Sequence, residues 1–481
     1  MIRNPDLPLH AHFSAAGSRW SVRSNSLEVL QAVAETFPRL NHRGRATLTA
    51  EIYVDQNAGT TSLWSVPQFR GRDHLVFADY GPDACMLADL RARHVIGRFT
   101  PATVHDVSYW KRIILPILLG VAAPVVGVTA LHCACLQYKG EGLLITGESG
   151  SGKSTLSFEL ARRGLDFVSD DWTYFSRAGA DVLAWGLPTN IKLLPDAVVH
   201  FPELQNHLPS IHLNGELALE VTPEGINAKR SVCSRPGRIF VLERQPGWGF
   251  EAARLAPNEI AAYFQQSLER LPACLARSRE AQLATIRALA QGEAWHLRCG
   301  GSPQAIATHL LQFCDGTFPR RAAVPSSLQL VRREWPDMLR RFGALPCVKT
   351  FSFDSLQFQV ASDSERILRA LSHIAEPAAV STAPCFSWAI QEEPAWPRCL
   401  ALPTGLSCGS LSFLSFRQHS FLACDRQAGR AISFIAATTP DRELEGVLET
   451  MLLHLACQGT ATPLRVPPGF ALSAGSDVTT S

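Results

Sequence analysis

The chain has 481 residues, of which 46% are hydrophobic and only 18% are charged, and its 45 Lys and Arg residues are nearly balanced by 43 Asp and Glu residues. Such a composition is typical of globular proteins, and this length is enough for about two to four domains that each bury a core. The small net charge of +2 argues against a protein that binds nucleic acid electrostatically, because such proteins concentrate Lys and Arg to neutralise phosphates.

The cysteines and the N-terminal segment indicate a cytoplasmic protein. The 13 cysteines are odd in number and scattered, without a C-x-x-C pair, so the sequence predicts neither a disulfide framework nor a zinc site. Residues 1–8 lack the continuous apolar core of a signal peptide. We therefore expect reduced thiols inside the cell.

Residues 1–124 are predicted to form a small α+β domain that the chain repeats further on. The segment Trp20–Ser26 resembles Phe358–Ser364, and Thr100–Pro101 resembles Thr439–Pro440 at nearly the same offset along the chain. Each copy has alternating strands, one helix that begins after a Ser cap, further strands and a closing helix. The alternative is one irregular domain that surrounds the middle of the chain.

An apolar segment at the end of this first domain has the length of a membrane span. Residues 113–131 form a run without a charge, and the run is close to the length that a transmembrane helix needs. Prolines and glycines interrupt it, and both residue types weaken a helix. We therefore predict a helix that ends near Ala123, a buried strand from Val125, and no membrane span.

The strongest motif follows that strand. Residues 147–154 fit the pattern G-x-x-x-x-G-K-[ST], and they stand between the apolar run 143–146 and a helical stretch, 155–163. Glycines in such a loop let backbone N–H groups surround a polyphosphate, and the helix N-terminus adds a favourable dipole. The lysine would reach the β and γ phosphates, and the hydroxyl after it would bind Mg²⁺. The predicted nucleotide-binding residues are Gly147, Glu148, Ser149, Gly150, Ser151, Gly152, Lys153, Ser154 and Thr155.

Two further features near this loop could carry chemistry. Asp170 and Asp171 follow the helical stretch after a short strand. Adjacent carboxylates can divide their work, one near Mg²⁺ and one accepting a hydroxyl proton, since their repulsion raises one pKa. The alternative is a pair that only caps a helix or a turn. His132 lies upstream of the loop, in a strand where a lone histidine is usually a core residue.

Together, these residues resemble the catalytic domain of the HPr kinase/phosphorylase family. The order and spacing of His132, the glycine-rich loop, Arg163–Gly164 and the Asp pair match that family. The resemblance implies the P-loop fold of phosphoenolpyruvate carboxykinase type and transfer of phosphate from ATP, with Mg²⁺, to a serine hydroxyl. It also implies catalytic roles for Asp170 as general base, Asp171 as a residue that assists the metal, His132 near the transferred phosphate and Lys153.

Two departures from the family leave the acceptor open. The sequence lacks the downstream Glu-x-Arg-Gly-x-Gly signature that the family links to metal binding and to its reverse reaction, and the flanking domains do not resemble the family's N-terminal domain. The acceptor of the expected kinase is therefore an unidentified protein, peptide or small molecule. The alternative is a nucleotide-gated regulatory or assembly ATPase without an acceptor, which would explain two similar domains on either side of the loop.

The expected fold class is α/β. A central P-loop domain of the HPr kinase and phosphoenolpyruvate carboxykinase type, residues 125–318, is flanked by two smaller related α+β domains, residues 1–124 and 345–460. Residues 461–481 are predicted to be a disordered tail, because Pro, Gly, Ser and Thr dominate their composition. Assembly into a homo-oligomer is a further expectation that the resemblance raises, without interface residues to support it.

Overall fold

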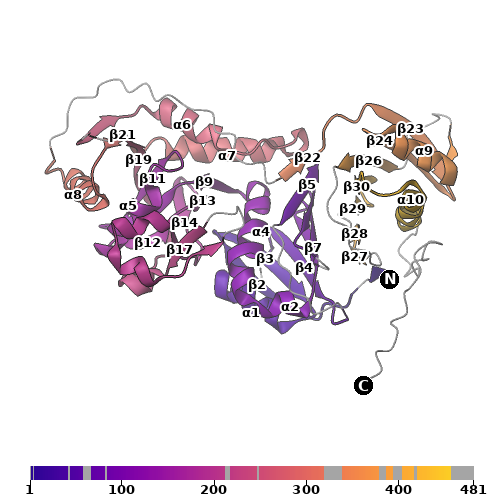
Figure 1. Cartoon of the computed structure of the whole chain (residues 1–481), viewed down its shortest axis with the longest axis horizontal. Helices are drawn as coiled ribbons and strands as arrows, with labels where there is room; N and C mark the ends of the chain where they lie inside the picture. The colour runs from indigo at the N-terminus through magenta and orange to yellow at the C-terminus, as the bar shows by residue number, and fades with distance from the viewer. Residues whose placement is uncertain are drawn as a thin grey trace, which may run out of the picture.

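The computed structural model describes residues 2–456 apart from 4, 42–43, 58–66, 82–83, 212–216, 246, 248, 319–338, 379–385, 394–403 and 417–419. The predicted tail lies outside the described residues. We call the glycine-rich loop at residues 147–154 the P-loop and the part of the chain around it, residues 128–318, the P-loop region. Figure 1 shows the P-loop region at the left, the sheet built mainly from residues 9–99 at the lower centre and the sheet built mainly from residues 347–436 at the right. We refer to the last two as the first repeat and the second repeat.

The first repeat is built on an eight-stranded sheet with the order β2-β3-β4-β8-β7-β6-β5-β22. Helix α1 (Leu27–Thr36) connects the parallel strands β3 and β4 and buries its apolar side against the sheet. The other helices of this region are α2 (Pro101–His105) and α3 (Val107–Tyr109). Its strands before the P-loop are β2 (Leu9–Ala15), β3 (Ser18–Ser24), β4 (Leu48–Val54), β5 (Gln68–Arg72), β6 (Leu75–Asp79), β7 (Cys85–Asp89) and β8 (His94–Phe99).

The apolar segment after these strands is a core helix. One helical stretch of the described chain, Val107–Val126, is long and apolar enough to cross a membrane, and 61% of its most apolar window is buried within the protein. It comprises α3, a π-helical turn, η1 (Trp110–Ile114), then α4 (Leu115–Ala122) and a 3-10 turn, η2 (Ala123–Val126). The predicted helix and strand are confirmed, but the strand begins at Val128, because Gly127 ends the helix with a left-handed φ of +77°.

The P-loop region has a six-stranded sheet with the order β12-β10-β11-β19-β21-β20. Strands β11, β19 and β21 are parallel. Strand β10 pairs antiparallel with both β11 and β12, and β20 pairs antiparallel with β21. Side chains alternate along β11, so Leu143 and Ile145 face one core and Leu144 faces the other. The strands are β10 (Ala134–Tyr138), β11 (Glu141–Gly147), β12 (Asp166–Ser169), β19 (Pro236–Arg244), β20 (Phe250–Arg254) and β21 (Glu293–Cys299).

Helices cover both faces of this sheet, as expected for an α/β fold. Residues of α5 and α8 belong to the core that contains Ile145, and residues of α6 and α7 belong to the core that contains Leu144. The helices are α5 (Lys153–Arg162), α6 (Pro257–Gln266), α7 (Ala276–Leu289) and α8 (Pro303–Cys314), with the 3-10 turns η3 (Pro195–Val199), η4 (Pro202–Asn206), η5 (Pro223–Ile226) and η6 (Ala273–Leu275).

Two small sheets complete this region and carry part of the candidate site. One has the order β18-β14-β13-β9 and the other β15-β17-β16. The strands of the first are β9 (Val128–His132), β13 (Trp172–Ala178), β14 (Asp181–Trp185) and β18 (Cys233–Ser234). The strands of the second are β15 (Ile191–Leu193), β16 (Ser210–Ile211) and β17 (Leu217–Val221).

The second repeat has a nine-stranded sheet with the order β1-β27-β28-β29-β30-β26-β24-β23-β25. Read from β23 to β27, this order matches that of the first repeat from β2 to β5, strand for strand. Its helices are α9 (Glu365–Ile374) and α10 (Asp441–Ala456). Its strands are β23 (Cys347–Phe353), β24 (Leu356–Ser362), β25 (Glu376–Pro377), β26 (Phe386–Glu393), β27 (Thr404–Cys408), β28 (Leu411–Phe416), β29 (Ser420–Asp425) and β30 (Arg430–Ala436).

The two repeats exchange one short strand each. Strand β1 (Ile2–Arg3) pairs in parallel with β27 of the second repeat, and β22 (Leu339–Arg341) pairs in parallel with β5 of the first. Each exchanged strand precedes its own repeat and completes the edge of the other sheet. The domain boundaries predicted from the sequence do not describe this exchange, because such short segments carry no recognisable strand pattern.

A separate hydrophobic core joins the sheets of the first and second repeats. Phe77 of β6 stacks on Phe421 of β29 with ring centroids 4.0 Å apart, within a cluster of buried apolar side chains from both repeats. Arg70 of β5 forms a buried ion pair with Glu393 of β26 at 2.6 Å. The repeats therefore contact each other through a packed apolar interface that contains a buried salt bridge.

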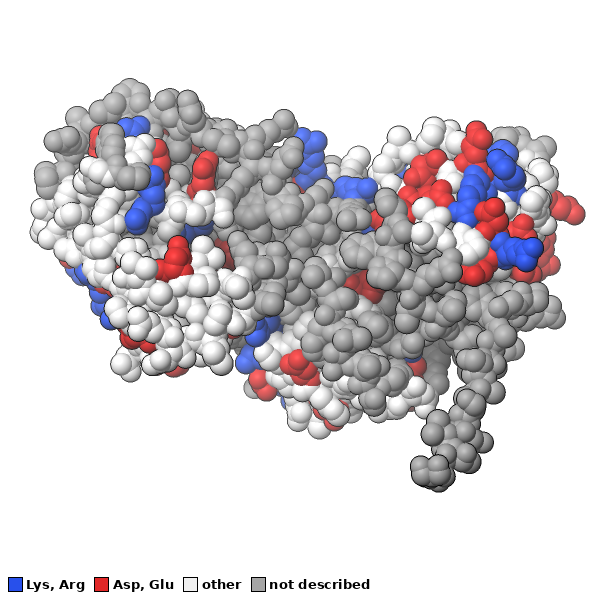
Figure 2. Space-filling model, viewed as in Figure 1, with Lys and Arg blue, Asp and Glu red and all other residues white. Residues whose placement is uncertain are grey.

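The visible surface carries mixed charge. Acidic and basic side chains lie interspersed on the face shown in Figure 2, most densely over the second repeat. Within this repeat, Arg366 pairs with both Glu392 and Asp441. The described residues of this face therefore present both signs of charge close together.

Candidate active site

The P-loop leaves the central sheet at the end of β11. This strand ends at Gly147, whose φ is +151°, and a Cβ atom there would lie 2.4 Å from the carbonyl oxygen of Leu242 in the adjacent strand β19. Only glycine fits, because this backbone conformation and this close approach both exclude a side chain. The loop thus lies at the carboxyl ends of two parallel strands, where ligands of open α/β sheets bind.

The glycines of the loop shape the start of helix α5. Gly150 and Gly152 have left-handed φ values of +76° and +88°, and Gly152 is the residue before the helix begins at Lys153. The first N–H groups of a helix have no partner within it and attract anions. Ser154 and Thr155, both half-buried, lie in this first turn.

The polar groups of the loop fit a polyphosphate. Lys153 Nζ donates to the carbonyl oxygens of Gly147 at 3.0 Å and Glu148 at 2.9 Å, so the buried lysine lies along the loop. The buried Ser151 hydroxyl has no hydrogen-bond partner among the described residues, a costly arrangement that a phosphate oxygen would relieve. Glu148 and Ser149 are exposed at the tip of the loop.

Asp170 is a buried carboxyl group. It follows β12, its residue is 3% exposed, and its Oδ2 accepts a hydrogen bond from the backbone N–H of Lys192 at 2.7 Å. Burial, and then repulsion by Asp171, raise the pKa of Asp170 to about 7. This carboxyl group therefore titrates near neutral pH.

Asp171 has the opposite environment. Its side chain is 42% exposed, and its Oδ1 lies 2.8 Å from Nε2 of His132. Desolvation opposes ionisation of Asp171, but the hydrogen bond and charge of His132, together with the charges of Lys192 and Lys153, lower its pKa below the ordinary value. Asp171 is therefore an ionised, accessible carboxylate at neutral pH.

Strand pairing explains why His132 meets Asp171. His132 ends β9, which runs antiparallel to β13 with His132 opposite Trp172. Asp171, the residue before Trp172, therefore lies within reach of the imidazole. The Trp172 ring, 38% exposed, lies beside that imidazole with centroids 5.7 Å apart. His132 therefore differs from the usual lone histidine of a buried strand, because it contacts a partly exposed carboxylate. Its predicted role near the transferred phosphate stays a prediction.

Buried hydroxyl groups fix the turn that carries the Asp pair. The hydroxyls of Ser169 and Thr173 lie 2.6 Å apart, and the Thr173 hydroxyl donates to the carbonyl oxygen of Cys133 at 2.7 Å. The Thr146 hydroxyl, in the strand before the P-loop, donates to the carbonyl oxygen of His132 at 3.1 Å. These bonds connect β9, β11 and β13, so the Asp pair, His132 and the P-loop are held by one network.

Arg244 is a site residue that the sequence interpretation missed. It ends β19, beside the P-loop strand, and its guanidinium lies 3.8 Å from where a Cβ on Gly152 would be. Its Nη2 donates to the carbonyl oxygen of Gly301 at 3.1 Å. A basic residue at the end of a strong apolar strand was the available signal, but only the parallel pairing of β11 and β19 shows that it approaches the loop.

Lys192 also belongs to this site. Its backbone N–H binds Asp170. Its charge opposes the rise in the pKa of Asp170 and contributes to the lowered pKa of Asp171. The structure places it beside the Asp pair, so the predicted residues and these two additional cations surround one region.

Comparison with known proteins identifies the family of this segment. Residues 125–194 match the family model described as HPr Serine kinase C-terminal domain. The HPr kinase/phosphorylase of Bordetella avium is 42% identical over 66 residues, which cover 14% of this chain and 21% of the relative. The HPr kinase/phosphorylase of Lachnoclostridium phytofermentans is 38% identical over 76 residues, 16% of this chain and 22% of the relative.

The likeness is confined to part of each protein. This chain spans about a fifth of the length of the curated relatives it matches, 21% and 22% for the two above. The solved structure of the Hpr(Ser) kinase/phosphatase from Coxiella burnetii aligns with 39% of this chain and 97% of its own, at 13% identity and a TM-score of 0.22, which is too low to support a conclusion about the fold. The resemblance seen in the sequence is confirmed for the segment that carries the P-loop, His132 and the Asp pair.

Proposed function

We propose that this chain, whose residues 125–194 match the HPr serine kinase C-terminal domain family, is a kinase. It transfers the γ-phosphoryl group of ATP to a serine or other hydroxyl of a protein, peptide or small-molecule acceptor. One observation carries the proposal: a His132–Asp171 pair, with an N–O distance of 2.8 Å, lies close enough to the P-loop lysine for that lysine's charge to lower the pKa of Asp171.

The P-loop residues provide the binding site for the nucleotide. The backbone N–H groups of residues 150–155 and the hydroxyl of Ser151 would hold phosphate oxygens, and Lys153 would turn from the loop carbonyls to the β and γ phosphates. Ser154 is the residue we propose as protein ligand of Mg²⁺, which supplies charge neutralisation at the transferring phosphate when bound. The role of Asp171 in holding the metal, predicted from the sequence, stays a prediction.

Accessibility favours Asp171 over Asp170 as the general base. A base must come within hydrogen-bond distance of the hydroxyl it deprotonates. The pKa of Asp170, about 7, would suit that task, but this residue is 3% exposed and holds the Lys192 backbone. Asp171 is accessible and is oriented by His132, so we assign it the base and give Asp170 a structural role, opposite to the sequence interpretation.

Lys192 and Arg244 complete the charge around the reacting group. Phosphoryl transfer spreads negative charge over the equatorial oxygens, and basic side chains stabilise that charge. Arg244 approaches the loop from β19 and Lys192 approaches from β15 on the side of the Asp pair. We propose that these residues and Lys153 together neutralise the phosphates while the acceptor binds near Asp171.

Labelled ATP tests the proposal and can identify the acceptor. The full-length protein is incubated with Mg²⁺ and γ-labelled ATP, with either purified HPr or a lysate of the source cell depleted of small nucleotides. We expect one labelled acceptor that disappears with Lys153→Ala. Labelling of HPr would show that this chain accepts the protein that its relatives are named after. Labelling of a different protein band would identify another acceptor. If no acceptor is labelled in either mixture, although an active HPr kinase labels HPr in a parallel control, the result would contradict the kinase proposal.

A nucleotide-gated ATPase remains the second candidate, and one observation favours it. Val128 of β9, Tyr174 of β13 and Leu187 lie in the same buried core as the helices of the first repeat. A shift in β9 or β13 on nucleotide binding would therefore reach the first repeat directly. ATP hydrolysis without a labelled acceptor, together with a nucleotide-dependent change in hydrodynamic radius, would support this function over the kinase.

We also propose that the protein acts in the cytoplasm. The described cysteines are free thiols, and most of them are buried, as is usual in a reducing compartment. Fractionation of the source cell tests this location.

A further inference from the structure

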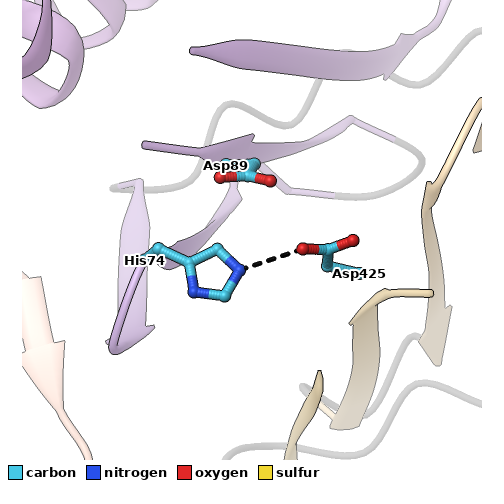
Figure 3. A group of neighbouring side chains, drawn as sticks. All are labelled: His74, Asp89 and Asp425. Atoms are coloured by element: carbon cyan, nitrogen blue, oxygen red, sulfur yellow. Dashed lines mark hydrogen bonds and ion pairs between the residues drawn. The ribbon is translucent and has the colours of Figure 1, made fainter. Parts of the chain in front are cut away.

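A second cluster of ligand-type side chains lies far from the P-loop in the sequence, where the two repeats meet. His74 follows β5, Asp89 ends β7, and Asp425 ends β29 of the second repeat. Their ligand atoms all lie within 4.8 Å of one another. Figure 3 shows the imidazole of His74 directed to Asp425, with the Asp89 carboxylate beside both.

The two aspartates occupy equivalent positions in the repeats. Asp89 Oδ1 accepts the N–H groups of residues 91 and 92, each at 2.8 Å, and Asp425 Oδ1 accepts those of residues 427 and 428 at 3.0 and 3.2 Å. One oxygen of each carboxylate is therefore used to close a turn. The second oxygen of each remains for the cluster.

His74 breaks the symmetry of this arrangement. The backbone carbonyl of His74 accepts the N–H of Leu90, and the equivalent carbonyl of Ser410 accepts the N–H of Arg426, so serine occupies the matching place in the second repeat. His74 Nε2 lies 3.1 Å from Asp425 Oδ2. Ligand atoms of a tetrahedral zinc site lie about 3.3 Å apart, given metal–ligand bonds of about 2.0–2.1 Å, so these two atoms already have a suitable separation.

The charges of this cluster are unbalanced. His74, Asp89 and Asp425 are 5%, 3% and 5% exposed. His74 can neutralise only one carboxylate, and no basic side chain of the described residues forms an ion pair with Asp89. Likewise, no described donor bonds the second oxygen of Asp89. A buried carboxylate without a positive charge beside it is costly even when backbone N–H groups bind one of its oxygens, and a divalent cation bound with neutral imidazole balances both aspartates.

We propose that His74, Asp89 and Asp425 bind a divalent transition-metal ion of the Zn²⁺ type, which links the two repeats. One imidazole nitrogen and two carboxylate oxygens are suitable ligands for zinc and leave a fourth position for water. Asp89 closes the remaining distance by a small rotation about its side chain. Because ligands come from both repeats, the ion stabilises their contact. It is separate from the Mg²⁺ proposed at the P-loop.

Zinc binding to the full-length protein tests this site. The protein is stripped with a chelator and titrated with Zn²⁺ against a chromophoric competitor, and the Tm is measured with and without Zn²⁺. We expect one Zn²⁺ per chain and a higher Tm with the ion. His74→Ser should weaken binding at least about tenfold and abolish the rise in Tm, since a lost ligand reduces affinity strongly.

Further variants distinguish this site from other ligands in the chain. Asp89→Asn and Asp425→Asn keep an oxygen for their turns but remove the charge, and both should lose zinc. One control is His94→Gln, which alters another histidine that pairs with a carboxylate, Glu51, at 2.9 Å. The other is Ser154→Ala in the P-loop. Both control variants should still bind zinc. Should an asparagine variant fail to fold, His74→Ser decides, because serine already occupies the equivalent place. Absence of zinc in the wild type, or equal binding by wild type and His74→Ser, would overturn the proposal.

Discussion

Asp170 and Asp171 are adjacent in the chain but differ in exposure, partners and charge. Asp170 is buried and bound to the Lys192 backbone, and Asp171 is accessible and bound to His132. Their order in the sequence could not show this difference, because both carboxyls follow the same strand. The deciding contacts come from β9, upstream of the P-loop, and from β15, downstream of β14. Only the folded strands bring His132 and Lys192 to the Asp pair.

The first prediction concerns the identity of the general base. Asp171→Asn should lower the rate of phosphoryl transfer by about 10²- to 10⁴-fold, the usual contribution of a positioned base, and leave nucleotide binding near normal. Asp170→Asn should keep most of the activity, because asparagine can still accept the Lys192 N–H. Single-turnover transfer from labelled ATP measures both. If Asp170→Asn caused a larger loss of activity than Asp171→Asn, Asp170 would be the general base.

The raised pKa of Asp170 predicts how stability depends on pH. Its pKa is about 7 in the folded protein against an ordinary value of 3.8, so between these values the folded state holds a proton that the unfolded state has lost. Asp170 therefore makes the free energy of unfolding fall as pH rises from about 4 to about 7, by at most about 4 kcal/mol.

Asp170→Asn removes this dependence. The stability of the variant relative to wild type should increase as pH rises from about 4 to about 7 and then level off, because over that range only folded wild type keeps a proton that its unfolded state has lost. Urea unfolding at a series of pH values measures the difference. A constant difference between the two proteins across this range would show that Asp170 does not titrate with a raised pKa.

At the scale of elements, the P-loop depends on how closely two parallel strands approach. A Cβ on Gly147 would meet the Leu242 carbonyl at 2.4 Å, and nothing lies within 4 Å of a Cβ on Gly150. Both residues have positive φ. We expect Gly147→Ala to unfold the loop and abolish ATP binding, whereas Gly150→Ala should cost about 1–2 kcal/mol from backbone strain alone.

Calorimetric titration with ATP and thermal unfolding of the two glycine variants check this prediction. Gly150→Ala serves as the matched control, since it adds the same methyl group in a left-handed position without the clash. Equal ATP affinity for the two variants would contradict the role given to the contact between Gly147 and β19.

Much of the P-loop region was predictable from the sequence because its signals are local. A glycine-rich pattern between an apolar strand and a helix identified the loop, and the Asp pair follows that helix after one short strand. Arg244 and the His132–Asp171 pair were harder to predict, because they depend on which strands are neighbours. Parallel pairing of β11 with β19 and antiparallel pairing of β9 with β13 are long-range properties that no short motif contains.

At the scale of the whole molecule, the repeats are joined by strand exchange, an apolar interface and buried charges. The sequence indicated two similar segments but could not show that β1 and β22 each pair with the other repeat. These strands are very short, and their partners lie far away along the chain. Their pairing depends on the edge of a sheet that exists only after the repeats have formed.

The buried ion pair between the repeats gives a prediction at this scale. Arg70 donates from Nε and Nη2 to Glu393 at 3.0 and 2.6 Å, and its guanidinium lies over the ring of Phe434, 5.2 Å from the centroid. Arg70→Met or Glu393→Leu alone should reduce stability by about 3–5 kcal/mol, because either change removes the opposite charge from beside a buried charged side chain.

The double variant should lose much less than the sum of the two single losses, since it leaves no unpaired charge. Chemical unfolding of the four full-length proteins completes the cycle. Additive losses would show that the two side chains act independently and that the ion pair does not hold the repeats together.

The most direct test of the kinase proposal is the fate of the γ-phosphoryl group of ATP. The measurement follows labelled phosphate from Mg-ATP, in the lysate that contains the acceptor, for wild type, Lys153→Ala and Asp171→Asn. We predict that wild type transfers the label to one acceptor and that neither variant does, although Asp171→Asn still binds ATP. Release of label only as inorganic phosphate by wild type, with no labelled acceptor, would contradict the kinase and favour the nucleotide-gated ATPase.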